Sequence, residues 1–183
     1  MARQDTRPRR RLDPTQRRAV IVTAAVQEFA AVGYDGATLT AVAARCESSE
    51  ALLYRYFPSK AALYAFAVQE SLDALSLYIQ RLSEAVPAGS SARDRVQAGL
   101  VARLEFTATD PLLRATRRGA AAQEPRESLA VRRAHRAAEV EVLTTYLQPQ
   151  PGARYRFALE GFLGFTDAAL DLWVLGGCTD DER

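Results

Sequence analysis

The first regular pattern of apolar residues predicts a long amphipathic helix near the start of the chain. Apolar side chains recur every three or four positions, as on one face of an α-helix, at Ile21, Ala24, Ala25, Phe29 and Val32. Asp13, Pro14 and Gln16 have the order of a helix N-terminus, with Asp as the cap and Gln completing a capping box. Gly33 lacks a Cβ atom and can adopt the left-handed conformation of a C-terminal stop. We therefore expect a helix from Pro14 to about Val32.

Two short helices follow, joined by a tight turn. Thr38 is placed to cap the first, whose apolar positions have helical spacing: Leu39, Val42, Ala43 and Cys46. The second begins near Ser49, directs Leu53 and Phe57 inward, leaves Tyr54 and Arg55 outside, and stops at Pro58. Two short helices after a longer supporting helix are typical of a helix-turn-helix, a unit that places its second helix in the major groove of DNA.

The remainder of the chain is also predicted to be helical. Pro- and Gly-containing breaks separate five segments with no competing strand pattern, at about 59–84, 92–109, 112–118, 126–147 and 153–176. Arg132, Arg133 and Arg136 lie near Glu139 and Glu141, which favours a solvated helix face. The expected fold class is all-α.

The segment 153–176 differs from the other helices because its apolar residues occupy more than one face. Gly161 and Gly164 are three positions apart, which permits close approach of another helix. One face would pack on its own domain and the other would suit a twofold partner, so we expect a homodimer. After Gly176 and Gly177, residues 178–183 read like the capped start of another helix. Two alternatives stay open, a short chain that dimerises through 153–176 alone or a chain that stops early.

Charge is distributed unevenly along the chain. Residues 1–60 carry nine Arg and one Lys against six acids, a net charge of +4, whereas residues 61–183 carry fourteen Arg against sixteen acids, a net charge of −2. Residues 1–18 alone hold seven Arg and two Asp. A basic arm over 1–12 is expected to be disordered and to be drawn to phosphate, although a merely solubilising tail has the same composition.

Specific residues in this region resemble the TetR family of bacterial regulators. The resemblance is carried by Gly33-Tyr34-Asp35-Gly36-Ala37-Thr38, by Val42-Ala43, and most strongly by Leu53-Tyr54-Arg55-Tyr56-Phe57-Pro58-Ser59-Lys60-Ala61-Ala62-Leu63. It covers about residues 15–66, and the later helices resemble the family only in class and length. The resemblance implies a helix-turn-helix DNA-binding domain followed by a helical domain for effector binding and dimerisation.

The resemblance also implies which residues contact DNA. Thr38 would touch phosphate through its hydroxyl, and Thr40 would reach a base edge. Ser49, Glu50 and Leu52 would read bases in the major groove. Tyr54 and Tyr56 would contact the sugar-phosphate backbone. Lys60, the only lysine of the chain, would pair with a phosphate. Alternatives remain for two of them: a solvated first-turn residue for Lys60, and packing against the first helix for Tyr54.

The turn between the two short helices departs from the family pattern. The family has a small residue, Gly, an aliphatic residue and Ser, where this chain has Cys46, Glu47, Ser48 and Ser49. A non-glycine residue at positive φ costs about 1 kcal/mol, and Ser48 gives up an apolar contact, so we expect a looser turn. Glu50 either accepts a hydrogen bond from a cytosine amino group or lowers non-specific affinity, and Leu52 suits a thymine methyl.

Candidates for an effector pocket between the later helices are apolar residues that would otherwise be ordinary core: Leu100, Leu104, Leu113, Val140, Leu143 and Phe162. Cys46 and Cys178 suggest neither a disulfide framework nor a zinc site, and no cofactor is expected. His135 is interpreted as a surface residue. With no Gly-rich phosphate loop, paired metal ligands or nucleophile motif, an enzyme is disfavoured.

The sequence therefore predicts a cytoplasmic, ligand-responsive regulator that represses from operator DNA and is released by a small molecule. No apolar run is long enough to cross a membrane. The expected boundaries are a basic arm at 1–12, a DNA-binding domain at 13–58 and an effector-binding and dimerisation domain at 59–183. The alternative is a helical ligand-binding or adaptor protein whose helix-turn-helix has weakened, as Glu47, Ser48 and Glu50 suggest.

Overall fold

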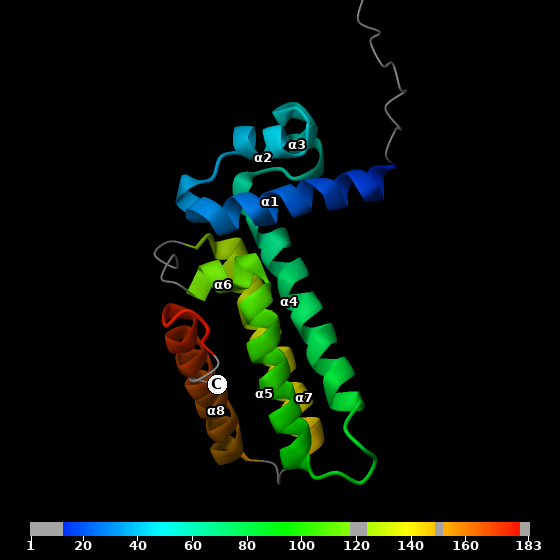
Figure 1. Ribbon diagram of the computed structural model, residues 1–183, viewed down its shortest axis with the longest axis vertical. Coiled ribbons are helices and arrows are strands. Elements are labelled where there is room, and N and C mark those ends of the chain that lie inside the picture. Colours follow the sequence, from blue (N-terminus) through cyan, green and yellow to red (C-terminus); the bar gives the residue numbers. More distant parts are fainter. Residues whose placement is uncertain (1–12, 118–123, 149–151, 180–183) are drawn as a thin grey trace, which may run out of the picture.

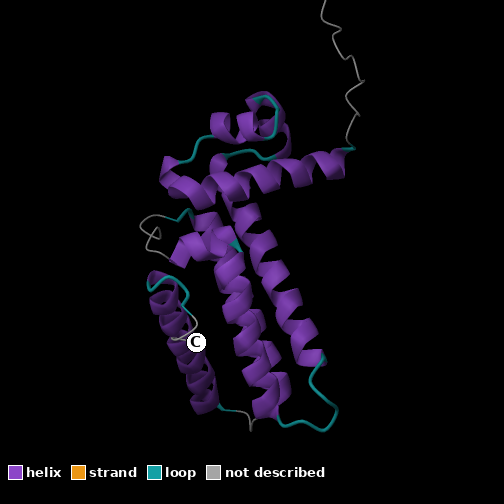
Figure 2. Ribbon diagram, viewed as in Figure 1, coloured by secondary structure: helices purple, strands orange, loops and turns teal. Residues whose placement is uncertain are grey.

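The computed structural model describes residues 13–117, 124–148 and 152–179, and every regular element in these ranges is an α-helix (Figure 2). The helices are α1 (Pro14–Gly36), α2 (Leu39–Arg45), α3 (Glu50–Tyr56), α4 (Lys60–Glu84), α5 (Ala92–Thr109), α6 (Pro111–Arg117), α7 (Arg126–Leu147) and α8 (Ala153–Leu175). The predicted all-α class is confirmed, and the later helices agree with their predicted bounds to within a residue or two. Expectations for residues 1–12 and 180–183 lie outside the described residues.

The helices form two parts, a head of α1–α3 and a bundle of α4–α8. Figure 1 shows α1 lying across the top of the bundle, with α2 and α3 above it and α6 directly below it. The helices α4, α5 and α7 run along the length of the molecule, and α8 lies beside them. The head is thus presented at one end of an elongated bundle.

Side-chain caps set the starts of the head helices as predicted. Asp13 accepts from the backbone N–H of Gln16 at 2.8 Å, and the Gln16 side chain accepts from the Asp13 N–H at 3.3 Å. Thr38, Ser49 and Ser59 accept in the same way from N–H groups in the first turns of α2, α3 and α4. Each cap satisfies a helix donor that would otherwise have no partner.

Gly33 produces a kink rather than the predicted end of α1. Its φ of 72° and ψ of 176° are non-helical, yet helical structure resumes and runs to Gly36. Ala37 then donates its N–H to the Gly33 carbonyl at 3.2 Å. The positive φ explains the glycine, because a Cβ atom would be strained there.

The turn between α2 and α3 is closed by a Schellman motif that has Glu47 at the left-handed position. Glu47 has a φ of 47°, its N–H donates to Ala44 O at 3.2 Å, and the Ser48 N–H donates to Ala43 O at 2.9 Å. The Ser48 hydroxyl donates to Cys46 O and accepts from Arg17 of α1 at 3.4 Å. Polar contacts therefore take the place of the apolar contact that Ser48 cannot make.

One apolar core joins the head to the bundle. Residues of α1, α3, α4 and α6 share it, among them Phe29, Leu53, Leu63, Leu72 and Leu112, each with at most 6% of its surface exposed. The predicted inward positions of Leu53 and Phe57 are confirmed. Because α4 and α6 contribute to the core of the head, a shift of either helix must be accommodated by α1.

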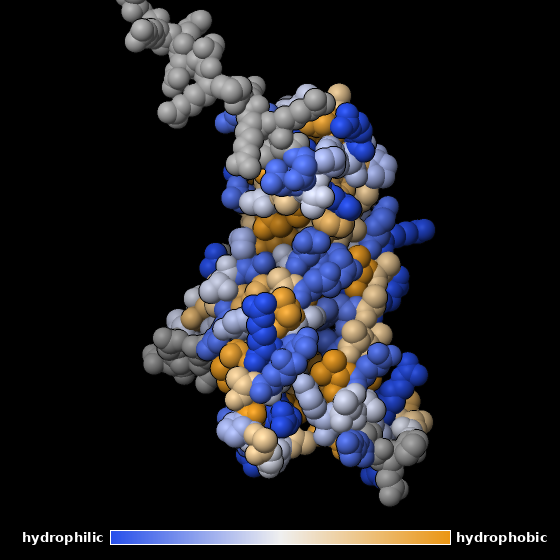
Figure 3. Space-filling model, turned by 90° about the vertical axis from the view of Figure 1, so that its right-hand side faces the viewer, coloured by the Kyte–Doolittle hydropathy of each residue, from blue (hydrophilic) through white to orange (hydrophobic). Residues whose placement is uncertain are grey.

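The outer face of α4 is mostly hydrophilic. Figure 3 shows polar side chains predominating over the middle of this face, with apolar side chains in small groups. Within the described ranges, no helix combines the length and the apolar character that a membrane crossing requires.

Glu47→Gly is expected to raise the free energy of unfolding by about 0.5 to 1 kcal/mol. Glycine avoids the cost of about 1 to 2 kcal/mol that a side chain pays in the left-handed conformation. Part of this gain is cancelled because glycine has a greater conformational entropy in the unfolded chain. Ala44→Gly, an exposed helical position three residues earlier, should lower the same quantity by about 1 kcal/mol. Urea unfolding followed by circular dichroism measures both, and a loss of stability on Glu47→Gly would contradict the strain.

Candidate nucleic-acid interface and ligand cavity

The predicted DNA-contacting residues lie on and around the two short helices. Thr38 and Ser49 cap α2 and α3, and Lys60 is the first residue of α4. Thr38, Thr40, Ser49, Glu50 and Tyr54 are exposed. Leu52 and Tyr56 are half-buried, and Tyr56 packs on the edge of the apolar core. Five of the eight residues thus have the exposure that a DNA contact requires, while their roles stay predictions.

Thr40 and Glu50 meet across the helix-turn-helix. The Thr40 hydroxyl donates to the Glu50 carboxylate, so the acid at the first position of α3 is held by a side chain of α2. A carboxylate in the first turn of a helix is also favoured by the helix dipole. Glu50 therefore stabilises the arrangement of the two short helices in addition to any contact with a base.

Lys60 turns back onto the head. Its Nζ donates to the carbonyls of Tyr34 at 2.9 Å and Ala37 at 3.1 Å, and it lies 4.5 Å from the centroid of the Tyr34 ring. These contacts tie the first turn of α4 to the segment after the kink in α1. A phosphate contact by Lys60 stays a prediction, and the structure gives this residue a positioning role that the sequence did not suggest.

Two arginines add positive charge beside these residues. Arg55 is exposed on α3, and Arg45, at the end of α2, has a side chain that is 43% exposed. Arg45 also pairs with the buried Glu28 of α1 at 2.7 Å. Arg55 was predicted to face outward, but neither arginine was predicted to contact DNA.

A cavity of about 400 Å³ lies in the bundle between α4, α5, α7 and α8. Three of the predicted pocket residues line it, namely Leu100, Leu143 and Phe162. The wall also includes residues that were not predicted as ligand contacts: Ser76, Ile79, Ser83, Arg95, Val96, Arg103, His135, Glu139, Val142, Tyr146 and Leu163. On α7 the lining positions are 135, 138, 139, 142, 143, 145 and 146. All but 145 follow helical spacing, a signal that a search restricted to apolar residues overlooks.

The other three predicted pocket residues lie elsewhere. Leu104 lines a second hollow of about 200 Å³, together with Leu170 and Trp173. Leu113 is 4% exposed in the core shared with the head, because α6 packs across α1. Val140 is half-buried on α7 but lines neither hollow.

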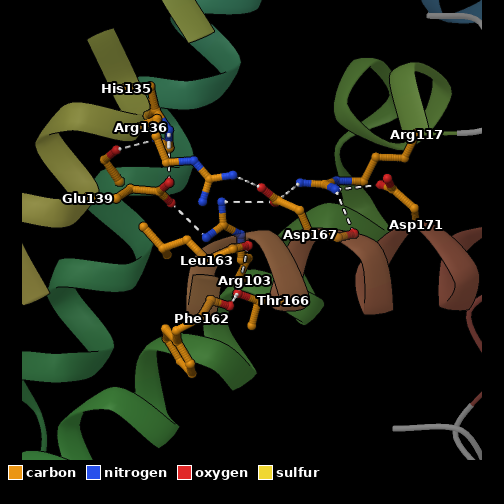
Figure 4. Close-up of polar contacts among 11 residues, drawn as sticks. Arg103, Arg117, His135, Arg136, Glu139, Phe162, Leu163, Thr166, Asp167 and Asp171 are labelled. Carbon is orange, nitrogen blue, oxygen red and sulfur yellow. Dashed lines mark hydrogen bonds and ion pairs between the residues drawn. The ribbon is translucent and has the colours of Figure 1, made fainter. Parts of the chain in front are cut away.

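Six charged residues form an ion cluster next to the cavity: Arg103, Arg117, Arg136, Glu139, Asp167 and Asp171 (Figure 4). Asp167 of α8 is its centre, 3.0 Å from Arg117, 3.7 Å from Arg103 and paired with Arg136. Arg103 also pairs with Glu139 at 2.7 Å, and Arg117 with Asp171 at 2.6 Å. The cluster therefore joins α5, α6, α7 and α8.

These contacts correct the prediction that α7 carries a solvated charged face. Arg133 and Glu141 are exposed, but Arg136 and Glu139 belong to the ion cluster. Arg132 makes two hydrogen bonds of 2.7 Å with Glu124, which also accepts from Tyr64 of α4 at 3.0 Å. The prediction was wrong because the acidic partners come from other segments, which helical spacing on α7 cannot reveal.

The electrostatic environment of Asp167 favours its charged form. Burial acts to raise the pKa of this carboxyl, but the charges of Arg103, Arg117 and Arg136, with the hydrogen bond from Arg117, hold the pKa below its ordinary value of 3.8. At neutral pH the cluster therefore contains three arginines and three carboxylates in balance.

His135 lines the cavity and is not the surface residue predicted. Its side chain is 10% exposed, and burial, aided by Arg103 and opposed by Glu139, Asp73 and Asp167, lowers its pKa. Nε2 lies 3.1 Å from the Ser76 hydroxyl and Nδ1 lies 3.7 Å from Glu139. The Ser76 hydroxyl also lies 3.0 Å from Leu72 O, so it can donate either to that carbonyl or to Nε2. Nδ1 is beyond hydrogen-bond distance of Glu139, so this carboxylate does not orient the imidazole through a hydrogen bond.

A helix-turn-helix head on a helical bundle that contains a cavity resembles the architecture of DNA-binding regulators that carry their own ligand domain. Residues 21–66, about a quarter of the chain, match the family model described as bacterial regulatory proteins, tetR family. The helix-turn-helix head is therefore similar to the DNA-binding domain of that family. No curated protein matches the sequence.

Solved structures show the same fold at low sequence identity. A TetR-family regulator from Streptomyces coelicolor is 21% identical, with a TM-score of 0.77 over 93% of this chain and 76% of that one. A TetR-like regulator from Rhodococcus sp. RHA1 is 24% identical, with a TM-score of 0.68 over 93% and 90%. The regulator FadR from Bacillus subtilis, in complex with stearoyl-CoA, is 19% identical, with a TM-score of 0.71 over 90% of each chain.

Asp167→Asn is expected to lower the free energy of unfolding at pH 7 by about 2 to 3 kcal/mol. Breaking a fully buried pair costs about 3 to 5 kcal/mol, and the 26% exposure of this side chain reduces the cost. Because the folded pKa is depressed, the contribution of the carboxylate is complete above pH 3.8 and is lost as the pH falls further. Denaturant unfolding from pH 7 to pH 3 should therefore show less acid destabilisation in the variant.

Asp171→Asn is the matched control on the same helix. Its side chain is 47% exposed, and among the described residues its ion-pair partner is Arg117 alone, so the change should cost less than about 1 kcal/mol. Equal losses in the two variants would contradict the central position of Asp167.

Proposed function

We propose that this regulator represses transcription from operator DNA and is released when a small molecule occupies the cavity of the bundle. The observation that carries the proposal is the position of α4, which lines the cavity with Ile79 and Ser83 and contributes Leu63 and Tyr64 to the core of the head. A ligand that alters α4 thereby acts on both parts of the chain. The site of action would be DNA in the cytoplasm.

The proposed mechanism is a shift between two arrangements of paired heads. Two recognition helices must lie roughly 34 Å apart to read successive turns of one DNA face. Tilting α4 changes that spacing, and a ligand that binds the tilted arrangement more tightly lowers operator affinity by the same difference in free energy. The FadR complex with stearoyl-CoA supports a small-molecule effector in a bundle of this fold.

The alternative of a ligand-binding or adaptor protein with a weakened helix-turn-helix is not favoured. The three residues that motivated it have compensating contacts: Glu47 closes a Schellman turn, Ser48 binds Arg17, and Glu50 binds Thr40. The helix-turn-helix therefore keeps its geometry despite the departures from the family pattern.

The proposal includes a homodimer formed through α8. This helix buries Leu159, Leu163 and Leu170, whereas its opposite face exposes large apolar side chains: Phe157 at 77%, Phe165 at 73%, Leu172 at 70% and Leu175 at 61%. A Cβ atom added at Gly161 or Gly164, on the exposed side, would meet nothing within 4 Å. Such a stripe is more apolar than a solvated helix face and supports close packing against a second copy.

Tyr54→Phe is expected to weaken operator binding about fivefold to tenfold, because it removes one hydroxyl contact to the DNA backbone. Thermal stability should not change, since Tyr54 is 53% exposed. Tyr155→Phe removes a tyrosine hydroxyl from α8, outside the head, and should leave operator affinity intact. Fluorescence anisotropy on the upstream intergenic DNA across a salt series measures this effect, with random DNA as reference.

Lys60→Ala should differ from Tyr54→Phe by lowering both operator affinity and stability, because its ammonium holds two carbonyls of the head. If the unmodified protein bound its upstream DNA and other candidate operators no better than random DNA, the repressor proposal would fail.

Phe165→Glu is expected to raise the dimer dissociation constant at least about tenfold, because it places a charge from each copy in the apolar interface. Leu77→Glu, a comparable change at a 47% exposed position of α4, should leave association intact. Sedimentation velocity over a concentration series measures the difference. Identical behaviour of the two variants would count against α8 as the interface.

A further inference from the structure

The charged residues in the wall of the cavity balance one another in number and sign. Arg103 forms an ion pair with Glu139 at 2.7 Å, while its Nε is buried without a hydrogen-bond partner among the described residues. Arg95 donates to the Ser83 carbonyl at 3.2 Å, and Glu84 accepts from the Gln80 amide at 2.8 Å. The wall thus contains two arginines and two glutamates, and the buried ion pair is that of Arg103 and Glu139.

The remaining titratable group at the inner end of the cavity adds no positive charge at neutral pH. Burial lowers the pKa of His135, and Arg103 acts in the same direction. The formal charge of Glu84, Arg95, Arg103, His135 and Glu139 together is therefore zero.

A charged ligand group beside Arg103 and Glu139 would either break this buried pair or add an uncompensated charge next to it. Arg103 and Glu139 have side chains that are only 10% and 15% exposed. A carboxylate that took Arg103 would leave Glu139 buried without its partner, and an ammonium that took Glu139 would displace Arg103. Removing one partner of a buried pair costs about a hundredfold or more in affinity.

An uncharged ligand leaves every pair intact and gains the apolar surface of the wall. That surface is contributed by Ile79, Val96, Leu100, Val142, Phe162 and Leu163. The Ser83 hydroxyl is buried and has no hydrogen-bond partner among the described residues. A Cβ atom added at Gly99 would lie 3.9 Å from it, so the glycine leaves room beside a group that can donate to a ligand oxygen.

We propose that the cavity takes an uncharged, predominantly apolar molecule with a hydrogen-bond acceptor such as an ester or ketone oxygen, and discriminates against the corresponding acid and amine. The inference rests on the proposed function in taking this cavity as the effector site. Discrimination arises because the wall offers apolar surface and two buried donors without partners, the Ser83 hydroxyl and the Arg103 Nε, while its formal charges sum to zero.

The test compares three ligands that share one chain and differ at the head group: methyl decanoate, decanoate and decylamine. Each is titrated at pH 7 into the full-length protein, with isothermal calorimetry and operator anisotropy as readouts. The two ions are kept below their critical micelle concentrations, and the ester is kept below its solubility in water. Methyl decanoate should bind with a Kd at least about tenfold lower than either ion and should be the one that releases operator.

Further variants test where the ester binds and why the acid is disfavoured. Val142→Trp fills the cavity from a 47% exposed position and should abolish binding of the ester, whereas Ala137→Trp, exposed on the same helix outside the lining, should not. Glu139→Gln removes the charge that occupies Arg103 and should improve decanoate binding about tenfold while changing ester binding little.

The outcomes separate the two proposals. Tighter binding of decanoate or decylamine by the unmodified protein overturns the uncharged-ligand inference, and if that ion releases operator the repressor proposal stands. Binding of none of the three compounds, or ester binding that Val142→Trp leaves intact, also overturns the inference. A protein that binds the ester but has no operator affinity overturns the repressor proposal alone.

Discussion

The apolar core where α1 crosses α4 and α6 is the constraint on which the rest of the structure depends. Phe29 of α1, Leu63 of α4 and Leu112 of α6 are buried in one cluster, so the head has no core separate from the bundle. Close-packed interiors have little free volume, and α1 cannot keep its place if α4 or α6 moves. The boundary predicted between residues 58 and 59 marks a change of helix, while the packing continues across it.

The lower bundle is organised differently, by charge. The helix α8 contacts α6 and α7, and its Asp167 lies among arginines from three other helices. Buried ion pairs stabilise only when their geometry is precise, whereas the apolar packing near the head is not directional. The cavity lies beside the ion cluster, and Arg103 and Glu139 belong both to the cluster and to the wall of the cavity.

Most of the fold followed from the sequence, and only part of the sites did. Helical periodicity and caps such as Thr38 and Ser49 are local properties, so the helices and their starts were predictable. The cavity depends on which helix faces meet, and the spacing within one helix does not reveal this. The sequence therefore did not show that Leu113 and Val140 lie away from the cavity or that His135 lines it. The partners of Arg136 and Lys60 are distant in sequence, and no spacing on one helix indicates them.

The position of Lys60 has a chemical consequence. It is the only lysine of the chain, and its ammonium is half-buried and bound to the carbonyls of Tyr34 and Ala37. An acylating reagent must reach the nitrogen of the side chain, and here that nitrogen is bonded to two backbone oxygens. Acylation of this side chain therefore requires the ammonium to leave the two carbonyls, so its rate reports how often the first turn of α4 releases the segment after the kink in α1.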